Sequence, residues 1–183
     1  MKKEAMVVVV FSIFIFVFSN YSSAQCDGDF NCDGGVDGND LSVFAQSFGD
    51  ANCGGDIYVD FTEGQDLPDH GGSSDDPVKT ISYAIGKASC YCGAIINIAP
   101  GIYNENLTIA KDKIVLKKED GSTGDIIIDG GLQDVITIDG ANKVVVTEVI
   151  VQNGNNGIVG KDGSSFEVNN TIVQDCSTKG ILI

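Results

Sequence analysis

The stretch that decides the fold reads VVVTEVIVQNGNNGIVGKDGSSFEVNNTIVQDCSTKGILI, residues 144–183. Its first half is echoed by its second half about 22 residues later, with a slip of one residue at the glycine turn. A unit this short cannot bury an apolar face alone, so copies must stack to complete a core. The matched positions are Val146 with Val168, Ile150 with Ile172, Val151 with Val173, Gln152 with Gln174, Asn153 with Asp175, Gly157 with Gly180 and Ile158 with Ile181.

Short β-branched runs with the same character continue upstream at less regular spacing. Gly, Asn and Asp separate them, as is typical of strands joined by turns, and no long helical pattern intervenes. The sequence therefore predicts a mainly β chain, a right-handed parallel β-helix of few turns, with strands about 4.8 Å apart. An antiparallel sandwich of the same strands is the alternative, and it leaves the echo unexplained. The upstream runs are 95–98, 107–109, 114–116, 126–128 and 135–138.

Acidic residues dominate the composition. The 183 residues include 26 Asp and Glu against 11 basic residues, all of them lysine, and the net charge is −15. Neutralising phosphate groups needs a basic patch, so nucleic acid and anionic membrane surfaces are not expected partners. The length leaves room for one modest domain and a small module.

The N-terminus has the pattern of a secretory signal peptide. A positive start is followed by an apolar run over residues 5–18 and by small residues that end at Ala24. The run is short for a membrane span, which needs about 20 residues. We therefore expect residues 1–24 to be removed after Ala24, giving a secreted protein without a membrane segment. An uncleaved anchor and a lipoprotein at Cys26 are the alternatives, although Gln25 stands where lipid attachment needs Gly or Ala.

The next segment, residues 25–55, contains an acidic loop with the spacing of an EF-hand calcium site. Calcium takes six to eight oxygen ligands, and a glycine at loop position 6 permits the sharp turn around the ion. The loop has that glycine, Gly34, and an apolar residue, Val36, at position 8, a pattern that a mere acidic linker does not require. The expected metal ligands are Asp29, Asn31, Asp33, Gly35 through its carbonyl, Asp37 and Asp40. An apolar stripe then predicts a helix that begins at Leu41.

This stretch resembles one repeat of a type I dockerin, the calcium module that docks carbohydrate-active enzymes onto cohesin scaffolds. The resemblance covers about 22 residues, and it implies calcium as the cofactor and a cohesin-like partner. A dockerin has two such repeats, whereas one is found here, and Gly38 and Asn39 replace the usual Ser-Thr type of pair that contributes to cohesin recognition. The matching residues are Asp29, Asn31, Asp33, Gly34, Val36, Asp37, Asp40 and Leu41.

Six cysteines enter an oxidising environment if the chain is exported. Cys26 and Cys53 bracket the small loop-helix unit, which has little core of its own, so we expect a disulfide between them. The pairing of the others is left open by the sequence. Cys90 and Cys92 form a C-x-C, for which a disulfide or a buried thiol is favoured over a metal site.

Residues 56–76 are expected to form one strand and a flexible linker loop, in which His70 is a solvated residue without a catalytic role. Residues 77–183 follow as the β-helix, opened by a short capping helix over 77–88. The strand Ile57-Tyr58-Val59-Asp60, the helix from Pro77 to Ala88 and the run from Ile95 to Tyr103 follow one another in this segment. Together they resemble the start of the pectin-lyase-like right-handed β-helix domains of secreted bacterial proteins, a likeness that covers about residues 57–183. That resemblance implies extracellular polysaccharide binding or degradation, but the fold hosts enzymes and non-catalytic proteins alike.

The enzymes of that family resemble one another in using arginine with aspartates, or aspartates with histidine. This chain has no arginine and a single histidine, so no complete catalytic set is expected and no catalytic residue is assigned. Paired carboxylates could still cleave a glycosidic bond, although aspartates in Gly-rich turns are usually turn formers. The available aspartates are Asp125, Asp129, Asp134 and Asp139.

The sequence therefore predicts a secreted calcium-binding protein associated with extracellular polysaccharide or a cell-surface glycan. Because the sequence stops inside an apolar strand at Ile183, we expect the solenoid to continue beyond it. One alternative is accordingly the N-terminal part of a polysaccharide lyase or glycoside hydrolase with its catalytic residues in later turns. A cell-surface adhesion solenoid is the other alternative.

Overall fold

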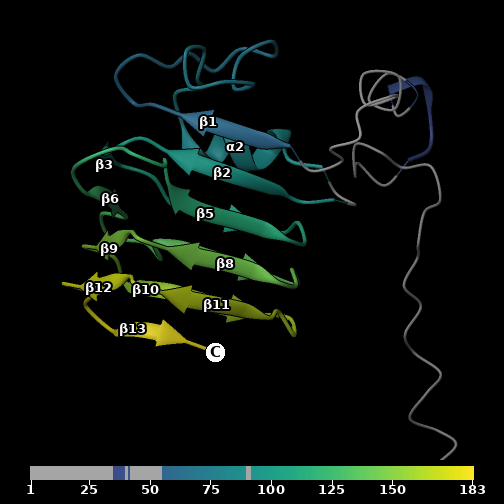
Figure 1. The fold of residues 1–183 in the computed structure, drawn as a ribbon. Coiled ribbons are helices and arrows are strands. Elements are labelled where there is room, and N and C mark those ends of the chain that lie inside the picture. The colour runs from purple at the N-terminus through teal and green to yellow at the C-terminus, as the bar shows by residue number, and fades with distance from the viewer. Residues whose placement is uncertain (1–34, 40, 42–54, 90–91) are drawn as a thin grey trace, which may run out of the picture.

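The structure of the chain is a computed structural model that describes residues 35–39, 41, 55–89 and 92–183. From residue 55 onward, strands and one short helix coil into a parallel β-solenoid of about four turns (Figure 1). The elements are β1 Asp56–Val59, α2 Ile81–Lys87, β2 Ala94–Ile98, β3 Gly101–Tyr103, β4 Leu107–Ile109, β5 Ile114–Lys118, β6 Ile126–Asp129, β7 Ile136–Asp139, β8 Val144–Thr147, β9 Ile150–Gln152, β10 Asn156–Lys161, β11 Phe166–Asn169, β12 Ile172–Gln174 and β13 Lys179–Leu182.

Three sheets run along the solenoid, and every strand pair within them is parallel. Their strand orders are β1-β2-β5-β8-β11, β4-β7-β10-β13 and β3-β6-β9-β12. Ile150 lies opposite Ile172, which is the 22-residue echo of the sequence. Ile158 lies opposite Ile181, one residue further, as the slip at the glycine turn predicts. The predicted parallel β-helix is confirmed, and an antiparallel sandwich is excluded for these strands.

Alternating burial along the strands builds the core. In β6, β7 and β8 every other side chain points inward and is buried, as in Ile136 and Ile138, while the intervening side chains are partly exposed. Full burial of an Ile or Val side chain contributes about 1.5–3 kcal/mol relative to leaving it in water. The parallel register stacks these side chains in rows, so each turn completes the core of its neighbour.

The turns of the solenoid differ in length. In the first sheet, Ala94 lies opposite Ile114, which is 20 residues later, whereas Val115 lies opposite Val145, which is 30 residues later. The extra residues of the second of these turns sit in the loops around β6. The upstream strands have the same apolar alternation as the later strands. Their spacing in the sequence is irregular because these loops differ in length from turn to turn.

The helix α2 caps the first turn, as predicted, but it is shorter than the expected 77–88. Thr80 is its N-cap, since the Thr80 hydroxyl accepts a hydrogen bond from Tyr83 N. The Glu105 carboxylate, from the loop between β3 and β4, accepts from Ile81 N at 3.0 Å and from Ser82 N at 2.9 Å. These acceptors satisfy the otherwise unpaired amides of the first helical turn, so the helix begins at Ile81.

The other end of α2 is held by Lys111, in the loop that follows β4. Lys111 Nζ donates to the carbonyl oxygens of Gly86 at 2.7 Å and Ala88 at 2.9 Å. The positive ammonium group complements the negative end of the helix dipole. Burial lowers the pKa of Lys111. Both ends of the cap are therefore tied to the first complete turn of the solenoid.

The loop between β1 and α2, expected to be a flexible linker, is held by specific hydrogen bonds. Asp66 accepts from Lys79 N and Thr80 N at 2.9 and 3.0 Å. His70 Nδ1 lies 2.7 Å from Asp76 Oδ1, and the His70 side chain is only 19% exposed. His70 is thus a half-buried residue with a structural partner rather than a solvated one. Composition alone does not reveal such pairing within a polar loop.

The export and disulfide predictions fall mostly outside the described residues. Residues 1–24, the cleavage site after Ala24 and the Cys26–Cys53 pair are not among them. Of the two cysteines in the described ranges, Cys92 and Cys176, the second is a free thiol. No helix in the described ranges is long and apolar enough to span a membrane.

Gly157→Ala tests the close approach between turns in the echoed region. A Cβ at Gly157 would overlap Val173 Cγ1 and the carbonyl oxygen of Gly180, which is backbone and cannot give way. The free energy of unfolding should fall by roughly 1–3 kcal/mol in urea titrations. Gly86→Ala is the control, because nothing lies within 4 Å of its added Cβ in α2, and it should raise stability by about 0.5–1 kcal/mol. Equal stability of Gly157→Ala and the wild type would contradict the packing between β10 and the following turn.

Candidate functional site

Two of the six predicted calcium ligands, Gly35 and Asp37, lie in the described part of the chain. The other four, Asp29, Asn31, Asp33 and Asp40, lie outside it. Among the residues that the structure does describe, no group of three or more His, Cys, Asp or Glu is placed to hold a metal ion. The calcium site therefore stays a prediction from the loop sequence.

Asp37, at position 9 of the predicted calcium loop, begins a helical segment. Its Oδ1 accepts a hydrogen bond from Asn39 N at 2.7 Å, and its carbonyl oxygen lies 3.4 Å from Leu41 N. These are the bonds of an N-cap residue and of the first helical turn. A calcium loop of the EF-hand type likewise passes directly into a helix. The oxygen donors of Asp37 and Gly35 suit calcium, which prefers carboxylate and carbonyl ligands.

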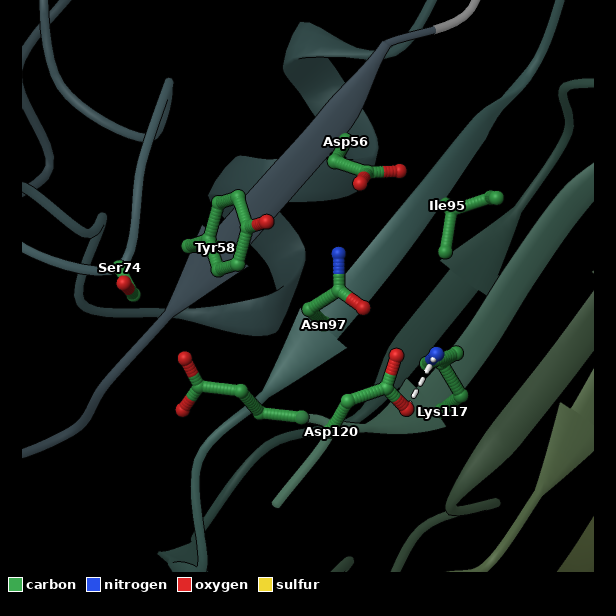
Figure 2. Close-up of a pocket in the computed structure, with 8 residues that line it drawn as sticks. Asp56, Tyr58, Ser74, Ile95, Asn97, Lys117 and Asp120 are labelled. Atoms are coloured by element: carbon green, nitrogen blue, oxygen red, sulfur yellow. Dashed lines mark hydrogen bonds and ion pairs between the residues drawn. The ribbon is translucent and has the colours of Figure 1, made fainter. Parts of the chain in front are cut away.

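A second candidate site is a groove on the outer face of the first sheet, across β1, β2 and β5 (Figure 2). Its volume is about 420 Å³, which lies within the range of small-molecule sites. We call it the polar groove, because seven of its eight lining residues are charged or carry an amide or hydroxyl group. It is lined by Asp56, Tyr58, Ser74, Ile95, Asn97, Lys117, Glu119 and Asp120.

The strand register assembles the polar groove. Tyr58 of β1 lies opposite Asn97 of β2, and Asn97 lies opposite Lys117 of β5. Neighbouring strands are about 4.8 Å apart, so these three side chains stand in one row on the outer face. Asp56 and Ile95 form a second row, two residues earlier on β1 and β2. The loop after β5 adds two acidic side chains, Glu119 and Asp120.

Asn97 is the most unusual residue of the polar groove. Its side chain is 5% exposed, although it stands on the outer face of the sheet. The amide nitrogen, Nδ2, is buried and has no hydrogen-bond partner. Figure 2 shows this nitrogen directed to the side of the groove where Tyr58 and Asp56 lie. Buried side-chain donors are nearly always paired, so an unpaired one needs an explanation.

The polar groove carries an excess of negative charge. Lys117 Nζ forms an ion pair with Asp120 Oδ1 at 2.8 Å, and the Asp120 side chain is 89% exposed. No described side chain forms a hydrogen bond or ion pair with the carboxylate of Asp56 or Glu119. The groove thus presents two free carboxylates, which accept hydrogen bonds and repel anions.

The aspartates considered for glycosidic cleavage serve different roles in the structure. Asp129 accepts hydrogen bonds from the side-chain amides of Asn153 and, at 3.2 Å, Gln152 of the next turn. Asp134 Oδ1 accepts from Asn156 Nδ2 at 2.8 Å, also one turn on. These two aspartates therefore link successive turns of the solenoid. Asp129 Oδ1 also accepts from Gly131 N at 3.2 Å, which is the local bond of a turn-forming aspartate. Asp125 is exposed and Asp139 is partly buried.

Comparison of the chain with protein-family models, curated proteins and solved structures found no match in any of the three. The parallel β-solenoid is therefore established by the structure alone. The likeness to dockerins and to pectin-lyase-like domains rests on the sequence motifs described above.

Sequence analysis did not identify the polar groove. Tyr58 and Asn97 were each visible as the one polar or aromatic residue within an apolar strand run. A polar residue that interrupts an apolar strand can indicate a binding site, because a side chain on the outer face of the sheet is not needed for the core. The two residues are far apart in the sequence, however, and only the register of β1 on β2 brings them together.

Asp129→Asn tests the link between turns and its dependence on pH. The Asn153 amide, followed by the Gln152 amide and the Gly131 N–H, lowers the pKa of Asp129 below its usual 3.8. A carboxylate with a lowered folded-state pKa stabilises the protein above the unfolded-state pKa, and this contribution is lost as the pH falls through the folded-state pKa. The variant should lose up to about 1 kcal/mol of stability at pH 7, and the difference from wild type should shrink below about pH 4.

The control for this measurement is Asp125→Asn, because Asp125 is exposed and its carboxylate has no described hydrogen-bond partner. Urea titrations of both variants between pH 3 and pH 7 separate the effects. A loss of stability in Asp129→Asn that does not vary with pH would contradict the role given to the ionised carboxylate.

Proposed function

We propose that this chain is a secreted calcium-binding protein whose β-solenoid attaches it to extracellular polysaccharide. The observation that carries the proposal is the polar groove on the outer face of β1, β2 and β5. A solenoid buries its apolar side chains inside and leaves its outer face for binding. A concave site with convergent polar groups on that face is the default candidate for a ligand site.

The calcium half of the proposal is supported by the spacing of the acidic loop and by the N-cap at Asp37. Oxygen ligands at loop positions 1, 3 and 5, with glycine at 6, have the pattern of calcium sites of the EF-hand type. The resemblance to a dockerin repeat adds a cohesin-like protein as a further partner. Because dockerins have two repeats and one is found here, the proposal depends on polysaccharide as the partner and not on a cohesin.

The mature protein should bind one calcium ion, as measured by calorimetric titration of the chelator-treated protein. Asp29→Ala and Asp33→Ala each remove a ligand at a position that contacts the ion directly, so each should abolish the heat of binding. Asp75→Ala is the control, because Asp75 is an exposed residue of the loop between β1 and α2. No heat with calcium in the wild-type protein would remove this half of the proposal.

Polysaccharide attachment is tested by co-sedimentation of the mature protein with insoluble cellulose, xylan and mannan, with and without calcium. The protein should appear in the pellet of at least one of them. If it stays in the supernatant with all three, and also migrates unretarded in gels that contain soluble neutral or acidic polysaccharides, attachment to polysaccharide is wrong.

A further inference from the structure

We infer that the polar groove is a binding subsite for an uncharged, hydroxyl-rich sugar unit, whose oxygen accepts a hydrogen bond from Asn97 Nδ2 and whose hydroxyls donate to Asp56 and Glu119. The inference rests on the proposed polysaccharide attachment and names its site and ligand class. It starts from two independent observations, an unpaired buried donor and a surplus of carboxylates in one groove.

The unpaired donor calls for an acceptor oxygen. Asn97 is buried at 5% exposure, and its Nδ2 bonds to no atom of the protein. Leaving such a donor unpaired is costly, and an apolar side chain at this outward position would avoid the cost. The nitrogen lies beside the half-buried Tyr58 of the edge strand β1, on the side of Asn97 that faces the groove. A ligand that supplies the oxygen recovers the lost hydrogen bond.

The carboxylates specify which ligand that is. Asp56 and Glu119 have no described partner, and carboxylates accept short, strong hydrogen bonds from hydroxyl groups. A sugar ring presents several hydroxyls on adjacent carbons and can donate to both sides of the groove. An acidic sugar brings a further negative charge next to these two, and the repulsion excludes it. A bare metal ion is not the ligand, because no described cluster has three suitable donors close together.

Tyr58 completes the site. Its ring stands beside Asn97 in the same row of the outer face and has a polar tip and an apolar body. Ile95, which is 39% exposed, supplies the apolar wall two residues away. Sites that bind sugars need such a mixture, because each ring has both hydroxyl groups and apolar C–H surface. The groove therefore matches a sugar unit better than it matches an inorganic ion.

Asn97→Leu gives the sharpest test, because it moves binding and stability in opposite directions. The affinity of the mature protein for cellohexaose, xylohexaose or mannohexaose, whichever binds the wild type best by calorimetry, should fall at least tenfold. The melting temperature should rise, because the buried donor without a partner is gone. The matched control is Asn169→Leu, which makes the same change on β11 of the same sheet, away from the groove; it should leave the affinity unchanged.

Charge is tested with Asp56→Asn and Glu119→Gln against the same neutral hexasaccharide and against hexagalacturonate. The wild type should bind the neutral sugar and not hexagalacturonate, and each variant should bind the neutral sugar at least threefold more weakly. Wild-type affinity of Asn97→Leu for the neutral sugar would overturn the inference, as would a preference of the wild type for hexagalacturonate. If groove variants still co-sediment with polysaccharide as the wild type does, the inference fails and the proposed attachment stands; if the wild type binds no glycan, both fail.

Discussion

The structure depends on the stacking of buried side chains in register from one turn to the next. Each strand has apolar side chains at alternate positions, and parallel pairing places these directly above the apolar side chains of the previous turn, as Val168 lies opposite Val146. A shift by one residue would turn the whole buried row to solvent. This constraint explains why the loops vary in length while the strands keep their alternation, since extra residues in a loop do not disturb the rows.

Polar side chains at the corners reinforce the same register. Amides of one turn donate to carboxylates of the turn before, as Asn156 does to Asp134. Aspartate suits this pairing, because as an anion it is a stronger acceptor than a neutral amide oxygen. The corners and the core together hold the coil, so the outer face of each sheet is free to carry other chemistry. The polar groove occupies part of that face.

The strands and the solenoid were predictable because their signals are local: a period of two within each strand and a repeat of about 22 residues between the last turns. The calcium loop is also a local motif, and Asp37 takes a helix-start position that agrees with it. The polar groove was not predictable, because it depends on Tyr58 meeting Asn97 across a polar loop and a capping helix. The step of 30 residues from Val115 to Val145 was not predictable either, because the longer loops around β6 have no sequence signal that fixes their length.

The attachment of α2 at both of its ends couples unfolding of the helix to unfolding of the first turn. Glu105 and Lys111 belong to the first complete turn, and they hold the start and the finish of the helix. The capping helix therefore has no free end to act as a hinge. Lifting either end breaks hydrogen bonds to the first turn of the solenoid and exposes the buried residues Ile81 and Ile85. Helix and first turn accordingly behave as a single cooperative unit.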